Sequence, residues 1–290
     1  MKIFITGIHG FIAGHLNVFL QDKGYQVCGS TSRTSGLNNE RSPFEKIYPY
    51  KLGERFEDSM FKDIDVFIHC AHDFQKGALG KNILGTTALA EAANRHQVKK
   101  QIFISSLSSR PDAQSEYGKA KFEAEQVFKG YNGIIVRPGT VLGRGGIFAG
   151  MVGLVKRFPI VPLLDGGHSQ MYIIGIDDLC RAIYQIIKAE KNITEYNLYY
   201  PERVTLKEIL ITLRSLLKRK ILFIPFPSKL LILPLSFLNT IGIKLPVDID
   251  NLRGFIKSQT MIYRSDLPKV LDFYMPIKDI LKPLLKIPAS

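Results

Sequence analysis

The stretch Lys2-Ile3-Phe4-Ile5-Thr6-Gly7-Ile8-His9-Gly10-Phe11-Ile12-Ala13-Gly14 decides the fold. Its apolar start predicts a buried strand, and the amphipathic pattern that follows predicts a helix over 12–23. In such a unit, the N–H groups at the helix N-terminus can hold a dinucleotide pyrophosphate. Gly7 permits the sharp turn, Gly10 lets the backbone approach the phosphates, and the small Ala13 allows close packing of helix on strand. A plain tight turn is the alternative.

The rest of the chain alternates short apolar runs with helical patterns, which is typical of a parallel sheet with crossover helices. Further strands are predicted over 26–30, 65–70, 101–105, 133–136 and 196–199, and further helices over 82–95, 117–129 and 176–188. The Gly-rich stretch 139–153 and the region of Pro159, Pro162 and Asp165-Gly166-Gly167 are predicted as loops.

The predicted fold class is α/β, a Rossmann-type doubly wound parallel sheet with a smaller C-terminal substrate-binding lobe. We assign residues 1–200 to an NAD(P)-binding Rossmann domain, with a substrate-loop insertion around 140–172. Residues 201–290 are assigned to the substrate-binding lobe.

The chain has a formal net charge of +13, and much of the excess lies in its last third. Residues 201–290 contain fifteen Lys or Arg against seven Asp or Glu, a net of +8. Such an excess fits an anionic partner, namely nucleic acid, a lipid surface or a phosphorylated small molecule. No basic run is interleaved with aromatic residues, which argues against nucleic acid. The tight cluster Lys218-Arg219-Lys220 is interpreted as a solvated helix end.

Residues 221–246 are very apolar, but Pro225, Pro227, Pro234 and Lys229 interrupt them and argue against a membrane-spanning helix. A buried or substrate-lining segment is favoured, and contact with a membrane surface is the alternative. A cytoplasmic location is expected. The N-terminus runs directly into a strand rather than a secretion signal, and the three cysteines are widely spaced.

The end of the second predicted strand bears on cofactor choice. An acidic residue about 20 positions after the glycines normally binds the ribose 2′-hydroxyl of NAD. Here the sequence is Gly29-Ser30-Thr31-Ser32-Arg33, in which hydroxyls and a guanidinium can hold a 2′-phosphate. NADP is therefore slightly favoured over NAD, and the alternative is that Arg33 is an ordinary surface arginine.

Tyr117 and Lys121 lie four residues apart on a predicted helix, so both can face one cleft. A nearby ammonium favours the phenolate and is expected to lower the tyrosine pKa, so that Tyr117 can exchange a proton with a substrate oxygen during hydride transfer. Ser106, after the strand 101–105, is expected to hydrogen-bond that oxygen. Ser105 and Ser108 are rivals, and the alternative is that the serines merely end a strand.

Asn82 and the pair His69-x-x-His72 are two further candidate site features. Asn82, at the start of a predicted helix, is expected to fix the backbone of the site or a water near Lys121. His69-x-x-His72 raises the question of a metal site, but residues three apart on a strand face opposite sides and no further ligand cluster is evident. No metal is therefore predicted.

Several motifs follow one another along the chain, each occurring once: Thr6-Gly7-x-x-Gly10-Phe11-Ile12, Asp65-Val66-Phe67-Ile68-His69-Cys70-Ala71, Asn82-x-x-Gly85-Thr86, Ser105-Ser106, Tyr117-Gly118-x-x-Lys121, Arg137-Pro138-Gly139 and Ile176-Asp177-Asp178-Leu179. In this combination the chain resembles the extended short-chain dehydrogenase/reductases of the NAD-dependent epimerase/dehydratase family, which largely act on nucleotide sugars.

The resemblance implies Tyr117 as acid/base, Lys121 as its modulator and ribose ligand, and Ser106 as carbonyl ligand. It also implies a cofactor site made of Gly7, Gly10, Phe11, Ile12, Arg33, Ala71, Asn82, Lys121 and Pro138, and it places Asp178 in a structural turn. A homodimer is common in the family.

Four departures from the family pattern matter. Ala13 replaces a third glycine, and the acid after the second strand is missing. Leu107-Ser108 stands where the 4,6-dehydratases carry Asp-Glu, which disfavours sugar dehydration. The interval of eleven residues from Ser106 to Tyr117 is also short, which points to a trimmed substrate loop.

The expected function is NAD(P)-dependent oxidoreductase or epimerase chemistry at a hydroxyl or keto carbon of a nucleotide sugar, and a keto-sugar reductase is favoured. One alternative is a nucleotide-sugar 4-epimerase that retains NAD. Another is a non-catalytic NAD(P)-binding sensor or scaffold, against which the complete Tyr117, Lys121 and Ser106 set argues. Arg203, Arg253 and Lys257 are candidate ligands for a substrate phosphate.

Overall fold

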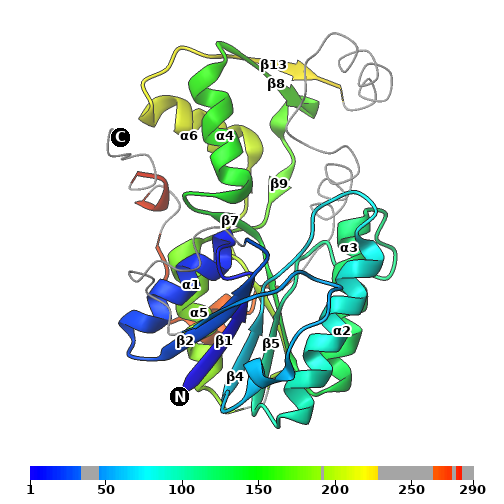
Figure 1. The fold of residues 1–290 in the computed structure, drawn as a ribbon. Helices are drawn as coiled ribbons and strands as arrows, with labels where there is room; N and C mark the ends of the chain where they lie inside the picture. Colours follow the sequence, from blue (N-terminus) through cyan, green and yellow to red (C-terminus); the bar gives the residue numbers. More distant parts are fainter. Residues whose placement is uncertain (34–45, 191–192, 228–263, 276–278, 283–290) are drawn as a thin grey trace.

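The computed structural model describes residues 1–33, 46–190, 193–227, 264–275 and 279–282. Its centre is a seven-stranded parallel sheet with the order β11-β6-β5-β4-β1-β2-β3 (Figure 1). The strands are β1 (Lys2–Thr6), β2 (Gln26–Thr31), β3 (Ile47–Pro49), β4 (Val66–His69), β5 (Lys100–Ile104), β6 (Ile134–Pro138) and β11 (Glu195–Leu198). The predicted Rossmann-type fold is confirmed.

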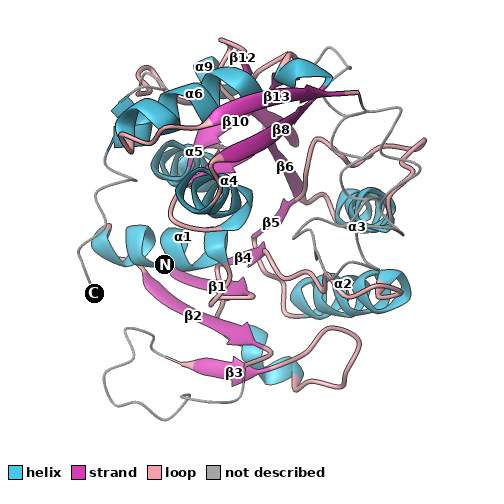
Figure 2. Ribbon diagram, turned by 90° about the horizontal axis from the view of Figure 1, so that it is seen from above, coloured by secondary structure: helices cyan, strands magenta, loops and turns pink. Residues whose placement is uncertain are grey.

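Helices cover both faces of the sheet. The helices α1 (Phe11–Asp22) and α5 (Ile176–Lys188) lie on one face, and α2 (Leu79–Arg95) and α3 (Glu116–Gly130) lie on the other (Figures 1 and 2). Because neighbouring residues of a strand point to opposite faces, Ile3 packs under α1 and α5, whereas Phe4 packs in the aromatic cluster under α2 and α3. Burial on both faces explains why the strands read as continuous apolar runs.

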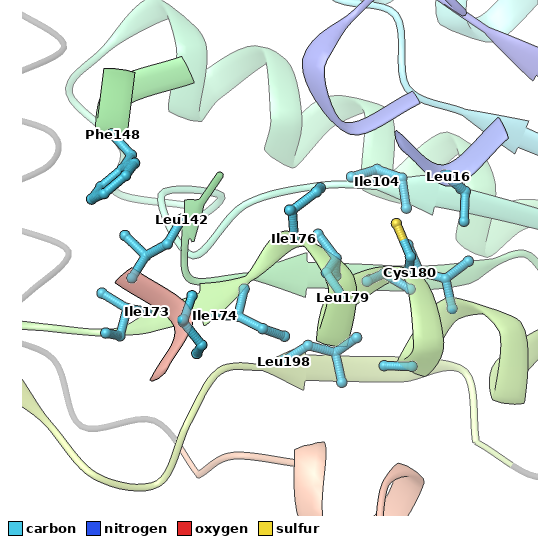
Figure 3. Close-up of a cluster of buried hydrophobic side chains, with 14 of the residues drawn as sticks. Leu16, Ile104, Leu142, Phe148, Ile173, Ile174, Ile176, Leu179, Cys180 and Leu198 are labelled. Atoms are coloured by element: carbon cyan, nitrogen blue, oxygen red, sulfur yellow. The ribbon is translucent and has the colours of Figure 1, made fainter. Parts of the chain in front are cut away.

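The core on the α1 and α5 side of the sheet extends beyond the Rossmann helices to residues of the region 140–175. Figure 3 shows Leu16, Ile104 and Cys180 in this cluster together with Leu142, Phe148 and Ile173. The last three come from the region around 140–175, so this region packs on the Rossmann core and is continuous with it.

The sequence located the regular elements of the sheet to within a few residues. Helix α2 begins at Leu79, three residues earlier than predicted. The short edge strand β3 was not predicted, because three residues give too little periodicity to recognise.

The loops predicted over 139–153 and around Pro159 and Pro162 were wrong. This region forms β7 (Thr140–Leu142), α4 (Gly146–Arg157) and β8 (Ile160–Leu164). In α4 the residues Phe148, Met151 and Val155 recur at helical spacing and are buried, and the burial offsets the poor helix propensity of its glycines. Within the described residues β8 pairs with β13 (Leu222–Phe226) alone, so the N–H that Pro162 lacks interrupts no central ladder and the proline is tolerated.

Four other elements contribute to a lobe above the sheet (Figure 1). They are β9 (Gln170–Met171), β10 (Ile173–Gly175), β12 (Val204–Thr205) and α6 (Leu206–Leu216). Strand β10 pairs with β7 and strand β12 with β9. Helix α6 begins with a capping box, in which the Thr205 side chain accepts from the Glu208 N–H and the Glu208 carboxylate accepts from the Thr205 N–H. The lobe therefore combines residues from both sides of position 200, and the boundary at 200/201 stays a prediction.

The apolar segment 221–246 is described only as far as residue 227. Ile221 is buried, but Leu222 and Ile224 are 60% and 43% exposed, so burial fails at these two positions and a substrate-lining role stays a prediction. Residues 228–246 lie outside the described part. Among the described residues, no helix combines the length and apolar character needed to cross a membrane.

Asp178 anchors the start of α5 in the core. The side chain is 3% exposed and accepts hydrogen bonds from the Tyr200 hydroxyl at 2.7 Å, the Met275 N–H at 3.1 Å and Arg181 Nη1 at 2.8 Å. The Tyr200 oxygen in turn accepts from the Gly175 N–H at 2.8 Å. One carboxylate thus links α5, the segment after β11 and the described C-terminal residues.

We expect Asp178→Ala to lower the free energy of unfolding by about 2–4 kcal/mol, because it leaves buried donors without their acceptor. The exposed neighbour Asp177 is the matched control, and Asp177→Ala is expected to change stability by less than about 1 kcal/mol. Urea denaturation of both variants measures the difference. Equal losses would show that Asp178 acts only through the charge of the first helical turn.

Candidate active site

The glycine turn after β1 lies at the carboxyl edge of the sheet, next to Ala71, the second residue after β4. Gly7 has a φ of +65°, and a Cβ at this position would lie 3.0 Å from the Cα of Ala71. The Gly10 N–H donates to the Gly7 carbonyl at 2.7 Å, and a Cβ on Gly10 would lie 2.9 Å from that oxygen. Glycine is therefore required at both positions to close the turn.

Helix α1 starts at this turn with Gly10 as its N-cap, so no side chain caps its first N–H groups. These donors and the positive end of the helix dipole form a cradle for an anion, and a pyrophosphate fits it. Ala13 is 1% exposed and packs in the core. Ile12 is partly buried against the same core. The fit supports the predicted cofactor site, which stays a prediction.

Phe11 also meets the lobe. Its ring lies under the glycines at the start of α4, and a Cβ on Gly143 would lie 2.6 Å from the ring. The residue next to the phosphate cradle therefore packs against the turn that leads into α4. The glycines of this turn, read in the sequence as loop formers, are needed because the backbone passes so close to the ring.

The end of β2 offers hydroxyls and an arginine. Ser30 and Thr31 are buried, and the Thr31 hydroxyl lies 3.0 Å from His9 Nδ1 and accepts from the Arg33 N–H at 3.2 Å. The Arg33 residue is exposed. His9, which the sequence did not single out, thus ties the glycine turn to the end of β2.

The structure brings Tyr117, Lys121 and Ser106 together. Helix α3 begins after Ser115, whose hydroxyl accepts from the Gly118 N–H at 3.1 Å, and this cap places Tyr117 in the first turn. The Lys121 ammonium lies 5.9 Å from the centre of the Tyr117 ring and donates to the Ile104 carbonyl at 2.8 Å. The hydroxyl groups of Ser106 and Tyr117 share a hydrogen bond.

Burial controls protonation here. It raises the pKa of Tyr117, and the hydrogen bond from Ser106 only partly counteracts this. The predicted lowering of the Tyr117 pKa by Lys121 is therefore wrong for the protein alone. Burial also lowers the pKa of Lys121 to about 8, and a nearby carboxylate, Glu125, opposes that shift. Tyr117 is thus a protonated phenol at neutral pH.

The rival serines have other roles in the structure. Ser105 donates to Glu125 Oε1 at 2.5 Å and is buried. The Ser108 N–H donates to the Ser106 hydroxyl oxygen at 3.1 Å and so orients it. Of the three, Ser106 is the serine with a hydroxyl hydrogen-bonded to Tyr117.

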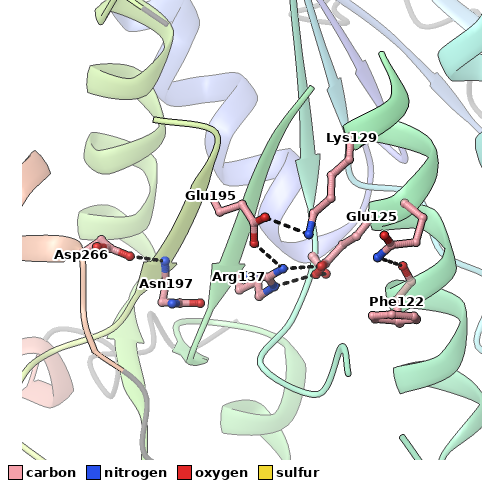
Figure 4. A network of polar contacts seen from close by, with 9 residues as sticks. Phe122, Glu125, Lys129, Arg137, Glu195, Asn197 and Asp266 are labelled. Carbon is pink, nitrogen blue, oxygen red and sulfur yellow. Dashed lines mark hydrogen bonds and ion pairs between the residues drawn. The ribbon is translucent and has the colours of Figure 1, made fainter. Parts of the chain in front are cut away.

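A buried ion pair lies behind these residues. Glu125 of α3 is 1% exposed, and its carboxylate accepts from Arg137 Nε at 2.8 Å and from Arg137 Nη2. Arg137 also contacts Glu195 at 2.8 Å, and Glu195 pairs with Lys129 (Figure 4). This network joins α3, β6 and β11 directly below the predicted cofactor residue Pro138.

Two aromatic neighbours of Tyr117 were missed from the sequence. The ring of His72 meets the Tyr117 ring edge to face at 4.9 Å, and the Phe74 ring stacks on it at 5.8 Å. Phe74 is 74% exposed, and burial lowers the pKa of His72 to about 2, so His72 is neutral. His72 and Phe74 come just after β4, at the same sheet edge as Ser106, and this position in the sequence could have identified them as site residues.

Asn82 holds the loop that carries these rings. Its side-chain oxygen accepts from the Asp73 N–H at 2.8 Å, and its amide donates to the carbonyls of Asp73 at 2.9 Å and Ala78 at 3.0 Å. The side chain therefore fixes backbone after β4, one of the two alternatives left open by the sequence.

His69 is a core histidine. Its ring lies between the hydroxyls of Thr6 at 2.7 Å and Thr86 at 3.0 Å, and burial lowers its pKa to about 3. Thr6 also accepts from the N–H groups of Cys70 and Ala71. Within the described ranges no group of three or more His, Cys, Asp or Glu residues is placed to hold a metal.

The candidate phosphate ligands are only partly described. Arg203 donates to Gln170 Oε1 at 3.1 Å and lies 5.0 Å from the centre of the Tyr172 ring. These contacts attach it to the strand pair β9 and β12. Arg253 and Lys257 lie outside the described residues.

The chain is similar to proteins of known family. The model of the NAD dependent epimerase/dehydratase family matches residues 3–199. A putative UDP-glucose 4-epimerase from Methanocaldococcus jannaschii is 25% identical over 54% of this chain, and the match spans only 61% of that relative's length.

Solved structures share the fold. MoeE5, solved with UDP-glucose and NAD, aligns with a TM-score of 0.67 and 17% identity over 89% of this chain and 98% of its own. The UDP-glucose 4-epimerase of Thermotoga maritima, solved with UDP-glucose, aligns with a TM-score of 0.66 and 19% identity over 89% of this chain and 98% of its own. With a family match over more than half of its residues and the same architecture, this chain belongs to the NAD dependent epimerase/dehydratase family.

Proposed function

We propose that the protein is an NAD(P)-dependent oxidoreductase that reduces a keto carbon of a nucleotide sugar. The observation that carries the proposal is the protonated Tyr117, hydrogen-bonded to Ser106 and one helical turn from Lys121. Reduction of a ketone needs a proton donor at the oxygen, and a phenol of raised pKa is in the right state at neutral pH.

The cofactor residues follow from the cradle and the end of β2. The turn at Gly7 and Gly10 would hold the pyrophosphate, and Ala71 and Pro138 would flank the cofactor. A bound nicotinamide would supply the hydride. Ser106 would hydrogen-bond the substrate oxygen, Tyr117 would donate its proton there, and Lys121 would bind ribose hydroxyls.

The nucleotide-sugar class rests on relatives. The matched curated relative is named a UDP-glucose 4-epimerase, and MoeE5 was solved with UDP-glucose and NAD. An excess of positive charge suits a diphosphate. The second candidate is a 4-epimerase with retained NAD, which the curated relative favours and which would use the same three side chains.

We expect Tyr117→Phe to lower turnover of a keto-sugar substrate by about 10²–10⁴-fold, because the proton donor is lost. Cofactor affinity should change little, since the ring and its contacts with His72 and Phe74 are kept. Steady-state rates and calorimetric titration with cofactor measure the two effects. Near-normal turnover by this variant would refute the catalytic assignment.

We expect Arg33→Ala to weaken the binding of NADPH by about 10–100-fold and the binding of NADH only slightly, because the substitution removes a charge-assisted contact to the 2′-phosphate. Arg95→Ala is the matched control, since Arg95 is an exposed arginine at the far end of α2, paired with Asp58. Titration of each variant with both cofactors measures the effect.

Equal losses for NADPH and NADH would show that Arg33 does not read the 2′-phosphate. Denaturing the purified wild-type protein provides an independent check on the reaction class. Release of tightly bound NAD would favour the epimerase, whereas an empty protein that prefers NADPH would favour the reductase.

The rate of keto reduction is expected to fall as the pH rises through about 8. Below that value Lys121 is an ammonium, and above it the side chain is neutral and loses its charge-assisted hydrogen bonds. Tyr117 stays protonated across this range because burial raises its pKa. A pH profile of kcat/KM that stays flat up to about pH 9.5 would contradict the assignment of Lys121.

A further inference from the structure

The two-stranded ribbon of β8 and β13 has one buried face and one exposed face. Val161 and Leu163 are 3% and 2% exposed and pack in the core. The pairing of Ile160 with Leu222 and of Pro162 with Ile224 places apolar residues side by side on the other face. We call this face, together with the preceding phenylalanine, the β8–β13 surface: Phe158, Ile160, Pro162, Leu222 and Ile224.

This surface is exposed to an unusual degree for aliphatic residues. Phe158, Ile160, Leu222 and Ile224 are 45%, 52%, 60% and 43% exposed. Single exposed apolar residues are normal, but adjacent ones on one face mark an interaction site. Figure 1 places β8 and β13 at the end of the lobe farthest from the seven-stranded sheet.

Basic residues border the surface. Lys156 and Arg157 at the end of α4 directly precede Phe158. Lys218-Arg219-Lys220 precede β13 with one residue, Ile221, between them, and all five basic residues are exposed. A hollow of about 480 Å³ lies beside the cluster 218–220. It is lined by Pro159, Arg214, Arg219, Lys220, Ile221 and Leu222.

Acidic residues are nearly absent from these segments. Residues 146–164 and 206–226 contain seven Lys or Arg and a single acidic residue, Glu208. Glu208 is engaged in the capping box at the start of α6, whereas the cluster 218–220 follows the other end of that helix. Ten positions, about 15 Å along a helix, separate Glu208 from Lys218. Next to the β8–β13 surface the positive charge therefore exceeds the negative charge, even when Asp165, which directly follows β8, is included.

We propose that the β8–β13 surface docks on an anionic membrane surface. Aliphatic and aromatic side chains flanked by cations suit the boundary between acyl chains and headgroups, where the apolar groups are buried and the cations meet phosphates. The cluster 218–220, read from the sequence as a solvated helix end, gains a partner in this arrangement. Docking there leaves helix α3, which carries Tyr117, away from the membrane, because α3 lies apart from β8 and β13 in both views (Figures 1 and 2).

Two other occupants fit less well. A second copy packed about a two-fold axis would bring the five border cations of each chain together, which is repulsive. Single-stranded nucleic acid is held by stacking on aromatic rings, and Phe158 is the one aromatic residue of the surface as defined.

The test is cosedimentation of the purified full-length chain with vesicles of phosphatidylcholine, with and without about a quarter phosphatidylglycerol. We expect binding only to the anionic vesicles, and weaker binding at about 0.5 M than at about 0.05 M salt. Neutralising the cluster with Lys218→Gln, Arg219→Gln and Lys220→Gln should weaken binding about a hundredfold, since each cation contributes about a factor of five.

Two matched controls test whether binding depends on this surface or only on the total charge and the exposed apolar area of the protein. Lys62→Gln, Lys81→Gln and Lys99→Gln remove the same charge from exposed positions on the Rossmann core and should leave vesicle binding unchanged. Leu222→Ser with Ile224→Ser should abolish salt-resistant binding. Val18→Ser with Leu84→Ser, at positions 53% and 69% exposed, should leave salt-resistant binding intact.

Failure of the wild-type chain to bind anionic vesicles would overturn the proposal, and so would equal losses in the cluster and control variants. If sedimentation equilibrium shows a dimer that the Leu222 and Ile224 changes dissociate while vesicle binding persists, the surface joins two copies and the proposal is wrong. Thermal unfolding of every variant checks that the lost binding is not lost folding.

Discussion

The site depends on one buried carboxylate. Glu125 is 1% exposed and binds both the Ser105 hydroxyl and the Arg137 guanidinium. It therefore ties α3, which carries Tyr117 and Lys121, to the ends of β5 and β6. A buried charge is tolerated only when it is paired and hydrogen-bonded, so the three elements must keep this arrangement for Glu125 to stay buried. The relative position of Ser106, Tyr117 and Lys121 follows from this constraint.

Burial then sets the charge state around that frame. It keeps the rings of His69 and His72 neutral and the phenol of Tyr117 protonated, and it lowers the pKa of Lys121 to about 8. The lysine ammonium thus lies 5.9 Å from the centre of the Tyr117 ring and is held by the Ile104 carbonyl. A cation beside a phenol that keeps its proton is an arrangement for giving a proton to a substrate oxygen, which is why keto reduction is the reaction proposed.

The elements of the lobe are buried on one side only, unlike the central strands of the Rossmann core. The lobe's helices α4 and α6 and the ribbon of β8 and β13 bury one side against the molecule and leave the other side to solvent. In a helix such an arrangement gives a period of 3.6 residues, but the glycines and prolines of 139–167 obscure it in the sequence. The glycines of α4 have a low helix propensity. The helix forms nevertheless, because the burial of Phe148, Met151 and Val155 outweighs that low propensity.

The sequence alone determined the doubly wound sheet, the glycine turn and the pairing of Tyr117 with Lys121, because local periodicity and residue spacing encode strands, helices and neighbours on one helix face. It also indicated Ser106, since strand ends share an edge. Only the tertiary structure decided which serine meets Tyr117, that His72 and Phe74 pack on its ring, and that burial raises the tyrosine pKa. These depend on elements distant in the chain and on desolvation, a property of the packed molecule that no local pattern contains.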